Sequence, residues 1–515
     1  MYIIFLIISG ILCSLPFINF SLFPLAWVSL VPFFIALYKS KNDKESVLFG
    51  FVFGIFFFGI TLYWITELRH FVSLWAYLGW IAVTLFQSLF IVVFSFILYR
   101  FVISRPSKYK GMWSFLWVLA PAVIWTLFEW LRSLGPYGIT GGGLGYSQAL
   151  FIPLIQIASF TGVYGISFII VLFNTALTPL FIEQGSILER FKKQLLTTIA
   201  ILILIFLVCF YGIVKVNISP PHPEVNGLRI AIIQANIPQK EKLDYGLVNK
   251  IFDTHLKLSH EILPAKPQVI IWPETAITDY LMENAVLLSR LKKFTFKNSC
   301  HLIVGAPYFS QDGKIFNSLI AFSPKGNVIQ RYDKKHLVPF GEYLPLRPLF
   351  YPLLKHTGNL FEEDFDSNPD VKPLPVKDYI SAATICFEST FPYIVRKRLK
   401  HGGDFILVVT NDAWFGDSPA AKQHFYSGVF RAIENGSYLV QVANTGISGV
   451  VDPFGRILKK TKLGERTAFI VKVNKRSKET FYLRYGDLFV YLCLIIVSIL
   501  VLQSFTRLGR PSYRK

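Results

Sequence analysis

Long apolar runs fill the first 216 residues of the chain and return after residue 485. A helix needs about 20 apolar residues to cross the roughly 30 Å of hydrocarbon in a bilayer. Windows of this kind predict eight membrane spans, at residues 2–19, 22–38, 47–66, 76–99, 112–130, 150–182, 195–214 and 485–505. Almost nothing separates the first two windows, so they could form a tight hairpin or a re-entrant pair, and the sequence leaves this open.

A different pattern begins after the stiff linker Pro220–Pro223. Short apolar runs alternate there with segments of helical periodicity. Strands are predicted at Arg229–Ile237, Val269–Trp272, His301–Ala306, Ser318–Phe322, Ile380–Cys386, Phe405–Thr410, Tyr438–Val451 and Arg466–Val473, and helices at Leu247–Leu263, Ala285–Phe296 and Pro419–Asn435. This mixture predicts an α/β or α+β domain whose sheets are covered by helices.

These two patterns divide the chain into three parts. Residues 1–216 are predicted to form a membrane domain with about seven transmembrane helices, residues 217–484 a soluble domain, and residues 485–515 a transmembrane helix with a basic tail. Composition supports a large lipid-facing part, because hydrophobic residues make up 53% of the chain and charged residues only 16%. An average soluble protein has about 25% charged residues.

The net charge of +20 does not by itself indicate a nucleic-acid partner, and we expect none. Many basic residues lie in short loops beside apolar segments, which is typical of cytoplasmic loops. With both termini in the cytoplasm, the predicted inner loops and tail carry Lys39, Lys41, Lys44, Arg100, Arg105, Lys108, Lys110, Arg190, Lys192, Lys193, Arg507, Arg510, Arg514 and Lys515. The short outer loops hold little beyond Arg69 and Arg132. Strict alternation of the spans then places residues 217–484 outside the cytoplasm.

No metal or cofactor is predicted. The five cysteines are Cys13, Cys209, Cys300, Cys386 and Cys493. They form no Cys-x-x-Cys pair and no dense framework. The nine histidines include no His-Glu-x-x-His motif, and His255 and His260 fit a helix surface better than a metal site.

Two features of the membrane part go beyond simple spanning. Glu129 and Arg132 lie at the outer end of the fifth window, where charged side chains either reach the interface or face a polar interior. The sequence leaves both explanations open. The glycine-rich loop Gly135–Gln148 cannot form a regular span. Its glycines suit irregular backbone that packs against another part of the protein, and we expect the soluble domain to be that part.

Three polar residues end or follow apolar strands of the soluble domain: Glu274, Lys334 and Cys386. Strand ends at one rim of a sheet are where catalytic groups gather on a rigid scaffold. A carboxylate there can take the proton of a thiol, and an ammonium can favour the thiolate and a later oxyanion. Taken singly, each residue has an ordinary explanation as a helix cap, a solvated lysine or a core thiol.

Taken together, the motifs resemble the nitrilase superfamily. Pro-Glu-Thr at a strand end, Tyr-x-Lys-x-x-Leu, Cys-x-Glu and Asn-Asp-Ala-Trp-Phe-Gly follow one another here in the order found in that superfamily. The segment Val338–Pro345 and the apolar N-terminal half narrow the resemblance to the apolipoprotein N-acyltransferases. Further matching motifs are Glu129–Arg132, Gly145–Gln148 and Gln234–Gln239. The resemblance implies a polytopic α-helical membrane domain plus a nitrilase-like αββα sandwich.

The resemblance also implies roles for individual residues. Glu274 would be the general base, Lys334 rather than Lys335 would stabilise the tetrahedral intermediate, and Cys386 would carry the acyl chain as a thioester. Supporting positions of the family are matched by Glu342, Phe387 and Glu388. Such an enzyme takes an acyl chain from a phospholipid and gives it to the N-terminal amine of a diacylated lipoprotein. We expect a monomer in the bacterial inner membrane, with the catalytic domain on the periplasmic side.

The same residues fit this chemistry without the resemblance. Passing an acyl group from ester to thioester to amide needs a nucleophile that is also a good leaving group, and a thiolate is both. The acceptor amine must lose a proton, which Glu274 can take. An apolar groove would keep water from the thioester. Candidates for a lid or for substrate contact are Trp414, Phe415, Phe340, Tyr343, Leu344, Asn411 and Tyr146, for which a core role is an equally good explanation.

Three departures from the family pattern bear on substrate positioning. Lys242-Leu243 stands where Lys-Trp is common, Phe387 keeps the ring of a common Tyr and loses its hydroxyl, and Gly141–Gly143 replaces a bulkier run. None of the three changes the expected reaction class.

Two other functions were weighed. A membrane-anchored nitrilase-type C–N hydrolase (amidase) would use the same three residues, but it has no need of the preceding spans. A non-catalytic membrane scaffold or transporter would have no reason to keep all three. The chain has no Gly-x-Ser-x-Gly elbow or P-loop that would indicate a serine hydrolase or an ATPase. The sequence therefore favours an acyltransferase.

Overall fold

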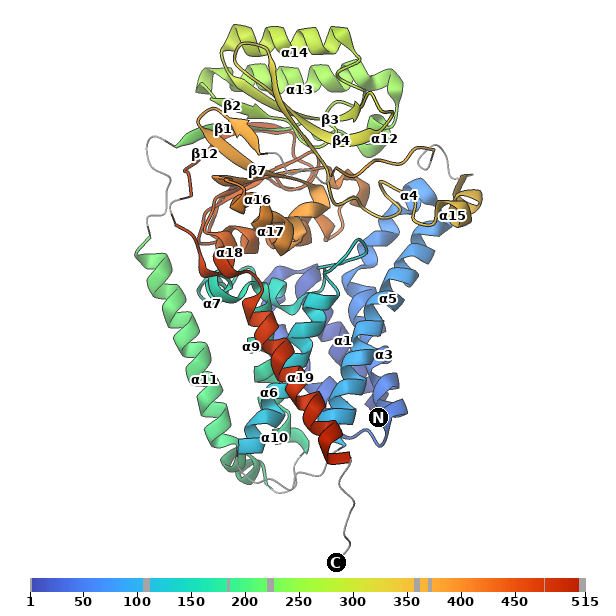
Figure 1. Ribbon diagram of the computed structural model, residues 1–515, viewed down its shortest axis with the longest axis vertical. Coiled ribbons are helices and arrows are strands. Elements are labelled where there is room, and N and C mark those ends of the chain that lie inside the picture. The colour runs from blue at the N-terminus through green and yellow to red at the C-terminus, as the bar shows by residue number, and fades with distance from the viewer. Residues whose placement is uncertain are drawn as a thin grey trace, which may run out of the picture. The chain divides into compact units, whose positions relative to one another are not determined.

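The computed structural model describes residues 2–104, 112–182, 186–219, 227–355, 362–368, 373–476 and 478–508. The chain forms two compact units (Figure 1). The helical unit comprises Met1–Thr66, Trp75–Ile218 and Tyr485–Lys515. The sandwich unit comprises Ser219–Arg484 together with the short segment Glu67–Leu74. The described strands all belong to the sandwich unit.

The helices of the helical unit are long, apolar and capped where polar residues interrupt the apolar runs. Asn42 begins one of them by accepting a hydrogen bond from the Glu45 amide at 2.9 Å, and Ser186 and Glu189 form a capping box at the start of another. The α-helices are α1 Tyr2–Ile18, α2 Val31–Tyr38, α3 Asp43–Thr61, α5 Leu74–Leu98, α6 Met112–Leu131, α7 Ile152–Ile155, α8 Ala158–Thr161, α9 Val163–Leu177, α10 Pro179–Ile182, α11 Ile187–Asn217 and α19 Leu488–Leu508. Shorter turns are η1 Phe20–Trp27, η3 Tyr99–Ile103 and η4 Leu144–Gln148.

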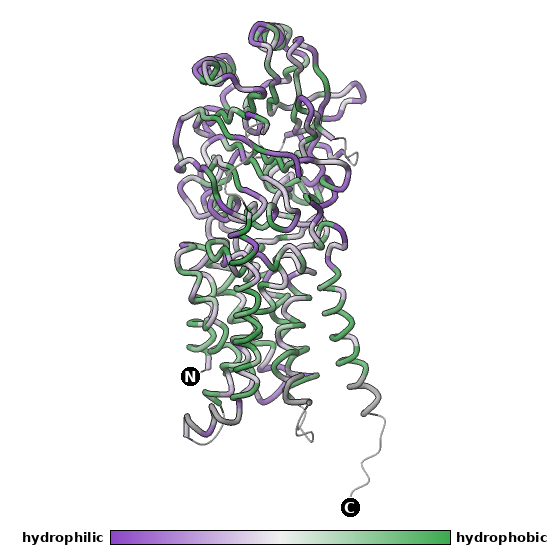
Figure 2. The backbone as a smooth tube through the Cα atoms, turned by 90° about the vertical axis from the view of Figure 1, so that its left-hand side faces the viewer, coloured by the Kyte–Doolittle hydropathy of each residue, from purple (hydrophilic) through white to green (hydrophobic). Residues whose placement is uncertain are grey.

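Hydrophobic residues dominate these helices, as the colouring of Figure 2 shows, and the protein is a membrane protein. Among the described residues, five helices are long and apolar enough to cross a bilayer: Phe20–Tyr38, Asp43–Thr61, Leu74–Ile103, Val163–Ile182 and Gln194–Asn217. Shorter apolar helices are Tyr2–Ile18, Val118–Leu131, Ile152–Thr161 and Leu488–Leu502. The predicted window 150–182 is not one continuous helix, because Gly162 with φ of 66° separates α8 from α9.

Glu129 on α6 and Arg132 directly after this helix face the interior of the helical unit, which decides between the two explanations that the sequence left open. Their exposed fractions are 7% and 4%. The Glu129 carboxylate accepts hydrogen bonds from the Leu144 amide at 2.8 Å and from the Ser167 hydroxyl at 2.6 Å. Arg132 donates to the carbonyl oxygen of Gly141 at 2.7 Å. Both charges are therefore paired with polar groups, as a buried charge must be.

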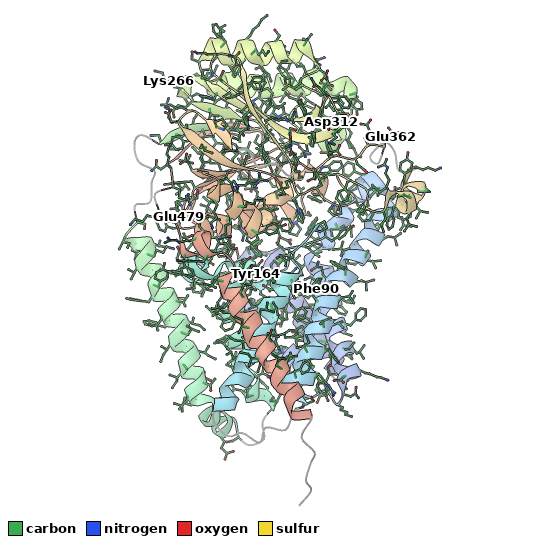
Figure 3. The ribbon with its side chains drawn as sticks, in the orientation of Figure 1. Phe90, Tyr164, Lys266, Asp312, Glu362 and Glu479 are labelled. Carbon is green, nitrogen blue, oxygen red and sulfur yellow. The ribbon has the colours of Figure 1, made fainter. Side chains whose placement is uncertain are left out.

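The glycine-rich loop after α6 packs on helices of its own unit. The Gly145 amide donates to the Ser167 hydroxyl at 2.8 Å, and a Cβ on Gly145 would lie 2.5 Å from the carbonyl oxygen of Val163. Nearby, the Tyr164 hydroxyl lies 3.0 Å from that of Ser133; Tyr164 is labelled in Figure 3. Only glycine lets the backbone approach this closely.

The sandwich unit contains two six-stranded sheets with matching topology. The first has the order β12-β1-β2-β3-β4-β5 and the second the order β11-β10-β9-β8-β7-β6. The strands are β1 Leu228–Gln234, β2 Val269–Ile271, β3 His301–Phe309, β4 Ile315–Phe322, β5 Val328–Asp333, β6 Leu374–Val376, β7 Tyr379–Ile385, β8 Phe405–Thr410, β9 Leu439–Ala443, β10 Gly449–Val451, β11 Ile457–Lys460 and β12 Thr467–Val473. Each sheet has three neighbouring parallel strands, β1 to β3 in one and β7 to β9 in the other. The predicted strand Tyr438–Val451 is in fact two antiparallel strands, β9 and β10, because the chain turns between them.

Helices cover the outer face of each sheet (Figure 1). Ile230 and Ile232 of β1 join the apolar layer between the sheets, while Ala231 and Ile233 pack under the helices of the first sheet. This burial on both faces explains why the parallel strands have continuous apolar sequences. The helices of the unit are α4 Arg69–Val72, α12 Gln239–Lys242, α13 Val248–Ile262, α14 Ala285–Asn298, α15 Arg347–Leu354, α16 Pro392–Lys400, α17 Ala420–Asn435 and α18 Phe481–Tyr485. The result is the αββα sandwich that we expected.

One histidine of α13 lies elsewhere than predicted. His255 is not on the helix surface but 1% exposed, and its ring lies 5.1 Å from that of Trp272. Burial lowers the pKa of His255 to about 4, so the ring is neutral at physiological pH. It is a core residue.

We predict that Gly305→Ala disturbs the segment that follows β2. A Cβ at this position would lie 2.4 Å from the Pro273 carbonyl oxygen and 2.8 Å from the Cα of Glu274. The clash involves backbone, so it should cost about 1–3 kcal/mol of stability, measured by thermal unfolding of the full chain in detergent. As a control, Gly313→Ala places its Cβ in open space at a φ of +80° and should cost only about 1 kcal/mol. Equal losses in the two variants would contradict this account.

Candidate active site

The three residues singled out from the sequence follow strands of the sandwich and meet at one place. Glu274 follows β2, Lys334 directly follows β5, and Cys386 directly follows β7. The Lys334 ammonium lies 3.4 Å from Oε1 of Glu274. Cys386 is close enough for its thiol to respond to both charges. The ends of β2, β5 and β7 thus place a carboxylate, an ammonium and a thiol together.

A second carboxylate, Glu342, completes a buried charge cluster. Its Oε1 lies 2.8 Å from the Lys334 ammonium, and the Asn317 amide donates to Glu274 and to Glu342, at 2.8 Å in each case. The Lys334 side chain is 1% exposed. Burial disfavours the ammonium, but the carboxylates of Glu342 and Glu274 outweigh this and raise the pKa of Lys334. The lysine therefore stays charged.

The backbone around Glu274 is held in an unusual conformation. Thr275 has a φ of 44°, which is rare for a β-branched residue. The buried Lys242 ammonium donates to the Glu274 carbonyl oxygen at 3.1 Å and to the Thr275 hydroxyl at 2.8 Å. On the other side, the Asn411 amide donates to Oε2 of Glu274 at 2.8 Å. Burial, partly opposed by Glu274, lowers the pKa of Lys242 to about 7.

Cys386 begins the turn η9 Cys386–Thr390 with a left-handed φ of 53°. Burial and the Glu274 carboxylate raise the pKa of the thiol, while the Lys334 ammonium acts in the opposite direction. The resting group is therefore the thiol, and it needs a base at the moment of attack. Glu274, held by three hydrogen-bond donors, is suited to take that proton.

Glu388 holds the turn η9, which carries Cys386, in place. It is fully buried and pairs with the Arg398 guanidinium at 3.0 Å. Further donors to its two oxygens are the Tyr332 hydroxyl and the amides of Ile385, Lys335 and His336, at 2.7–3.1 Å. Burial opposes the charge, but Arg398 and these donors outweigh it and lower the pKa of Glu388. Glu388 thus ties the loop that carries Lys334 to the turn that carries Cys386.

The residues proposed as a lid or as substrate contacts, and the supporting residue Phe387, differ in how exposed their side chains are. Phe340 is 46% exposed with a φ of 60°, and the Trp414 ring lies 5.0 Å from that of Phe71. Phe415, Tyr343 and Phe387 are half-buried, whereas Leu344 is buried. Asn411 is buried beside Glu274, and Tyr146 is buried in the helical unit.

Sequence reasoning missed several polar residues that surround the cluster. Asn317 is a polar residue within an apolar strand, which was a usable signal. Lys242 lay in a motif that was noted only for its neighbour Leu243. Asp412 lies in the Asn-Asp-Ala-Trp-Phe-Gly motif, which was noted only for the family resemblance, and His424 has no spacing that relates it to Cys386.

Cys386, Asp412 and His424 also present ligand-type atoms within 4.8 Å of one another. Among the described residues this is the group best placed to hold a metal ion. Their atoms are already engaged with one another and with neighbours, because Nδ1 of His424 lies 3.0 Å from Asp412 and its Nε2 lies 2.7 Å from the Ser389 hydroxyl. A metal bound to either ring nitrogen would break the contact that this nitrogen makes, so we interpret the group as a hydrogen-bonded cluster.

Comparison with known proteins gives full-length relatives. The model of the apolipoprotein N-acyltransferase N-terminal domain matches residues 9–176, and that of carbon-nitrogen hydrolase matches residues 229–481. The apolipoprotein N-acyltransferase of Geobacter metallireducens is 32% identical over 509 residues, covering 97% of this chain and 95% of the relative. The enzyme of the same name from Thermotoga maritima is 31% identical, covering 97% and 93%.

The likeness to solved structures is confined to part of the chain. An amidase of Nesterenkonia AN1 from the nitrilase superfamily is 18% identical, with a TM-score of 0.37, and covers 53% of this chain and 99% of its own. The carbon-nitrogen hydrolase match spans all twelve strands of the sandwich, and it confirms the nitrilase-like fold expected from the motifs.

We predict that the Glu388–Arg398 pair is strongly coupled. Glu388→Ala and Arg398→Ala should each cost about 3–5 kcal/mol, because each leaves a buried charge without its partner. The double variant should lose much less than the sum, measured by denaturant unfolding of the full chain. Since the pKa of Glu388 is lowered on folding, its stabilisation is present at neutral pH and is lost as the pH falls through the folded value.

The exposed pair Lys250–Glu241, 3.3 Å apart, provides the matched control. Alanine substitutions there should each change stability by no more than about 1 kcal/mol. Additive losses at Glu388 and Arg398 would contradict the proposed coupling.

Proposed function

The chain belongs to the apolipoprotein N-acyltransferase family, and from this premise we propose the reaction path that its residues carry out. The protein is an N-acyltransferase of lipoprotein biosynthesis, and its substrates are a lipid and a lipoprotein. We propose that the donor is a phospholipid, that the acceptor is the N-terminal amine of a diacylglyceryl-cysteine, and that Cys386 carries the acyl group between them. The observation that carries this proposal is the buried ammonium of Lys334 beside Glu274 and Cys386.

In the first half-reaction Cys386 attacks the ester carbonyl carbon of the phospholipid. Glu274 takes the thiol proton as the S–C bond forms, and the ammonium of Lys334 stabilises the negative charge that develops on the carbonyl oxygen. The C–O bond of the ester then breaks. The departing alkoxide takes the proton back from Glu274 and leaves as a lysophospholipid, and Cys386 is left as a thioester.

In the second half-reaction the lipoprotein amine attacks the same carbonyl carbon. Glu274 accepts a proton from the nitrogen as the C–N bond forms, and Lys334 again stabilises the oxyanion. The C–S bond breaks, and the Cys386 thiolate regains its proton from Glu274. The enzyme returns to its starting state with no net change in protons.

The burial of the cluster supports transfer rather than hydrolysis. The side chains of Glu274 and Lys334 are only 7% and 1% exposed. A dry site strengthens the electrostatic stabilisation by Lys334 and lowers the chance that water meets the thioester. The Phe340 side chain is exposed and that of Trp414 is half-buried, so both aromatic rings are accessible to the apolar part of a bound substrate.

The distribution of basic residues supports an orientation in the membrane. Lys39 and Lys41 follow α2, and Arg100 lies in η3 directly after α5; the positive-inside rule assigns these positions to the cytoplasmic side. We propose that both termini are cytoplasmic and that the sandwich unit faces the periplasm, where the lipid-modified amine is presented.

We predict that Cys386→Ala abolishes acyl transfer to a diacylated lipopeptide while leaving thermal unfolding nearly unchanged. Glu274→Gln should slow transfer by about 10²–10⁴-fold, because it loses the base but keeps the size of the side chain. Transfer is measured by mass spectrometry of the lipopeptide after incubation with purified enzyme and phospholipid vesicles.

Cys300→Ala is the control, since Cys300 is a buried thiol of the same unit that faces the helices of the first sheet. It should keep full transfer. Persistent transfer by Cys386→Ala would sink the proposed thioester path, and release of free fatty acid in place of the triacylated product would favour a hydrolase.

The orientation has a separate test with single engineered cysteines. A membrane-impermeant maleimide added to intact spheroplasts should label Lys325→Cys, on an exposed loop of the sandwich unit, and should leave Lys41→Cys unlabelled until the membrane is opened. The reverse labelling pattern would show that the orientation is wrong.

A further inference from the structure

Two buried titratable residues beside the nucleophile have no part in the reaction path above. Asp412 begins the turn that follows β8, and His424 lies on the first half of α17. Their exposed fractions are 3% and 8%. Atoms of both lie within 4.8 Å of the Cys386 sulfur, so a charge on either residue would change the stability of the Cys386 thiolate.

The hydrogen bonds around the His424 ring indicate which protons it carries. Nδ1 lies 3.0 Å from Oδ1 of Asp412, which can only accept. Nε2 lies 3.1 Å from the Cys386 carbonyl oxygen, also an acceptor, and 2.7 Å from the Ser389 hydroxyl. That hydroxyl donates its own proton to the Cys386 carbonyl at 2.9 Å, so its oxygen is available to accept. Both ring nitrogens therefore face acceptors, which is the arrangement that suits an imidazolium.

The surroundings of Asp412 also call for a positive partner. One carboxylate oxygen, Oδ2, has no hydrogen-bond partner among the described residues, and a Cβ on Gly446 would lie 2.2 Å from it. The Thr410 hydroxyl reaches Oδ1 at 3.0 Å. An unpaired carboxylate in this position opposes formation of the Cys386 thiolate, and Asp412 indeed contributes to raising the pKa of that thiol.

We propose that Asp412 and His424 are a positioning pair for the nucleophile, with His424 as an imidazolium that holds the Cys386 carbonyl oxygen and cancels the charge of Asp412 beside the sulfur. The contact with the carbonyl oxygen fixes the peptide that follows Cys386 and so helps to hold its φ of 53°. Neither residue exchanges a proton with substrate. This inference rests on the proposed role of Cys386 as the nucleophile.

The pair also affects Thr410, whose hydroxyl hydrogen can serve one acceptor at a time. Thr410 hydrogen-bonds the Cys386 sulfur as well as Asp412, and the bond to sulfur lowers the pKa of the thiol. When His424 satisfies Asp412, the Thr410 proton is free to stabilise the thiolate. The titratable group that faces the pair is Cys386 from η9, and the charges of Glu274 and Lys334 act on the same thiol.

The test is the rate at which iodoacetamide alkylates Cys386 as a function of pH, measured by mass spectrometry on the full chain in detergent. Alkylation reports the thiolate directly and needs no acyl substrate. His424→Gln keeps an amide donor for the Cys386 carbonyl but loses the positive charge. We expect it to shift the alkylation profile upward by about one pH unit, so that alkylation at a fixed pH is about tenfold slower.

The double variant His424→Gln/Asp412→Asn separates charge from packing. Because it removes the carboxylate as well, its profile should return toward that of the wild type. His401→Gln, a change at an exposed histidine at the end of α16, should leave the profile unchanged. An unshifted profile in His424→Gln would overturn the proposal, and so would a double variant that is slower than the single one.

Failure of the positioning pair can be distinguished from failure of the proposed reaction path. If transfer to lipopeptide survives in Cys386→Ala, the reaction path fails whatever the alkylation profiles show. If Cys386→Ala is inactive but the His424→Gln profile matches the wild type, the path stands and the positioning pair falls.

Discussion

The ammonium of Lys334 lies between two buried carboxylates, and the rest of the site is arranged around that one cation. Each buried ion costs several kcal/mol to take out of water, and attraction offsets this only when the remaining polar atoms are also satisfied. Here the side-chain amide of Asn317 donates to both Glu274 and Glu342. The backbone amide of Asn411 donates to Glu274, and the backbone amide of Val338 donates to Glu342 at 2.9 Å. The Lys334 ammonium and the two carboxylates are therefore held together by polar partners as one cluster.

The sandwich supplies the rigid frame that this cluster needs. Glu274 follows a strand of one sheet, and Cys386 and Asn411 follow strands of the other, so the apolar layer between the sheets fixes their separation. Next to the base and at the nucleophile, the backbone of Thr275 and of Cys386 is held away from its preferred conformation. Strained residues of this kind persist only where neighbours over-determine them. Lys242 holds Thr275, and the Glu388 network holds Cys386.

The sequence was sufficient for some of these features and insufficient for others, for physical reasons. The parallel strands could be predicted because burial on both faces leaves a continuous apolar run, as in Val269–Ile271. Strands β5, β6 and β11 were missed, and all three lie at a sheet edge. Strands β5 and β11 carry exposed or polar residues, as in Ile457–Lys460, and β6 has only three residues, one of them a proline. The predicted strand Phe405–Thr410 matches β8 in both bounds, whereas the bounds of other predicted strands shifted, since turns rather than hydropathy set where a strand ends.

The residues of the candidate site also divide into those that the sequence could indicate and those that it could not. Glu274, Lys334 and Cys386 could be proposed because each sits in a local motif whose order along the chain is informative. Asn317 and His424 act through contacts with residues that are distant in sequence, and a single sequence does not carry such contacts. The interior position of Glu129 and Arg132 was likewise settled only by their partners in the folded helical unit.

Acylation of Cys386 is the step on which the proposed reaction depends most directly. Purified enzyme is incubated with phosphatidylethanolamine in the absence of acceptor, digested, and analysed by mass spectrometry. We predict one acyl chain on the peptide that contains Cys386, lost on treatment with neutral hydroxylamine and lost on addition of a diacylated lipopeptide. An unmodified Cys386, with the acyl label on another residue or nowhere, would contradict the account.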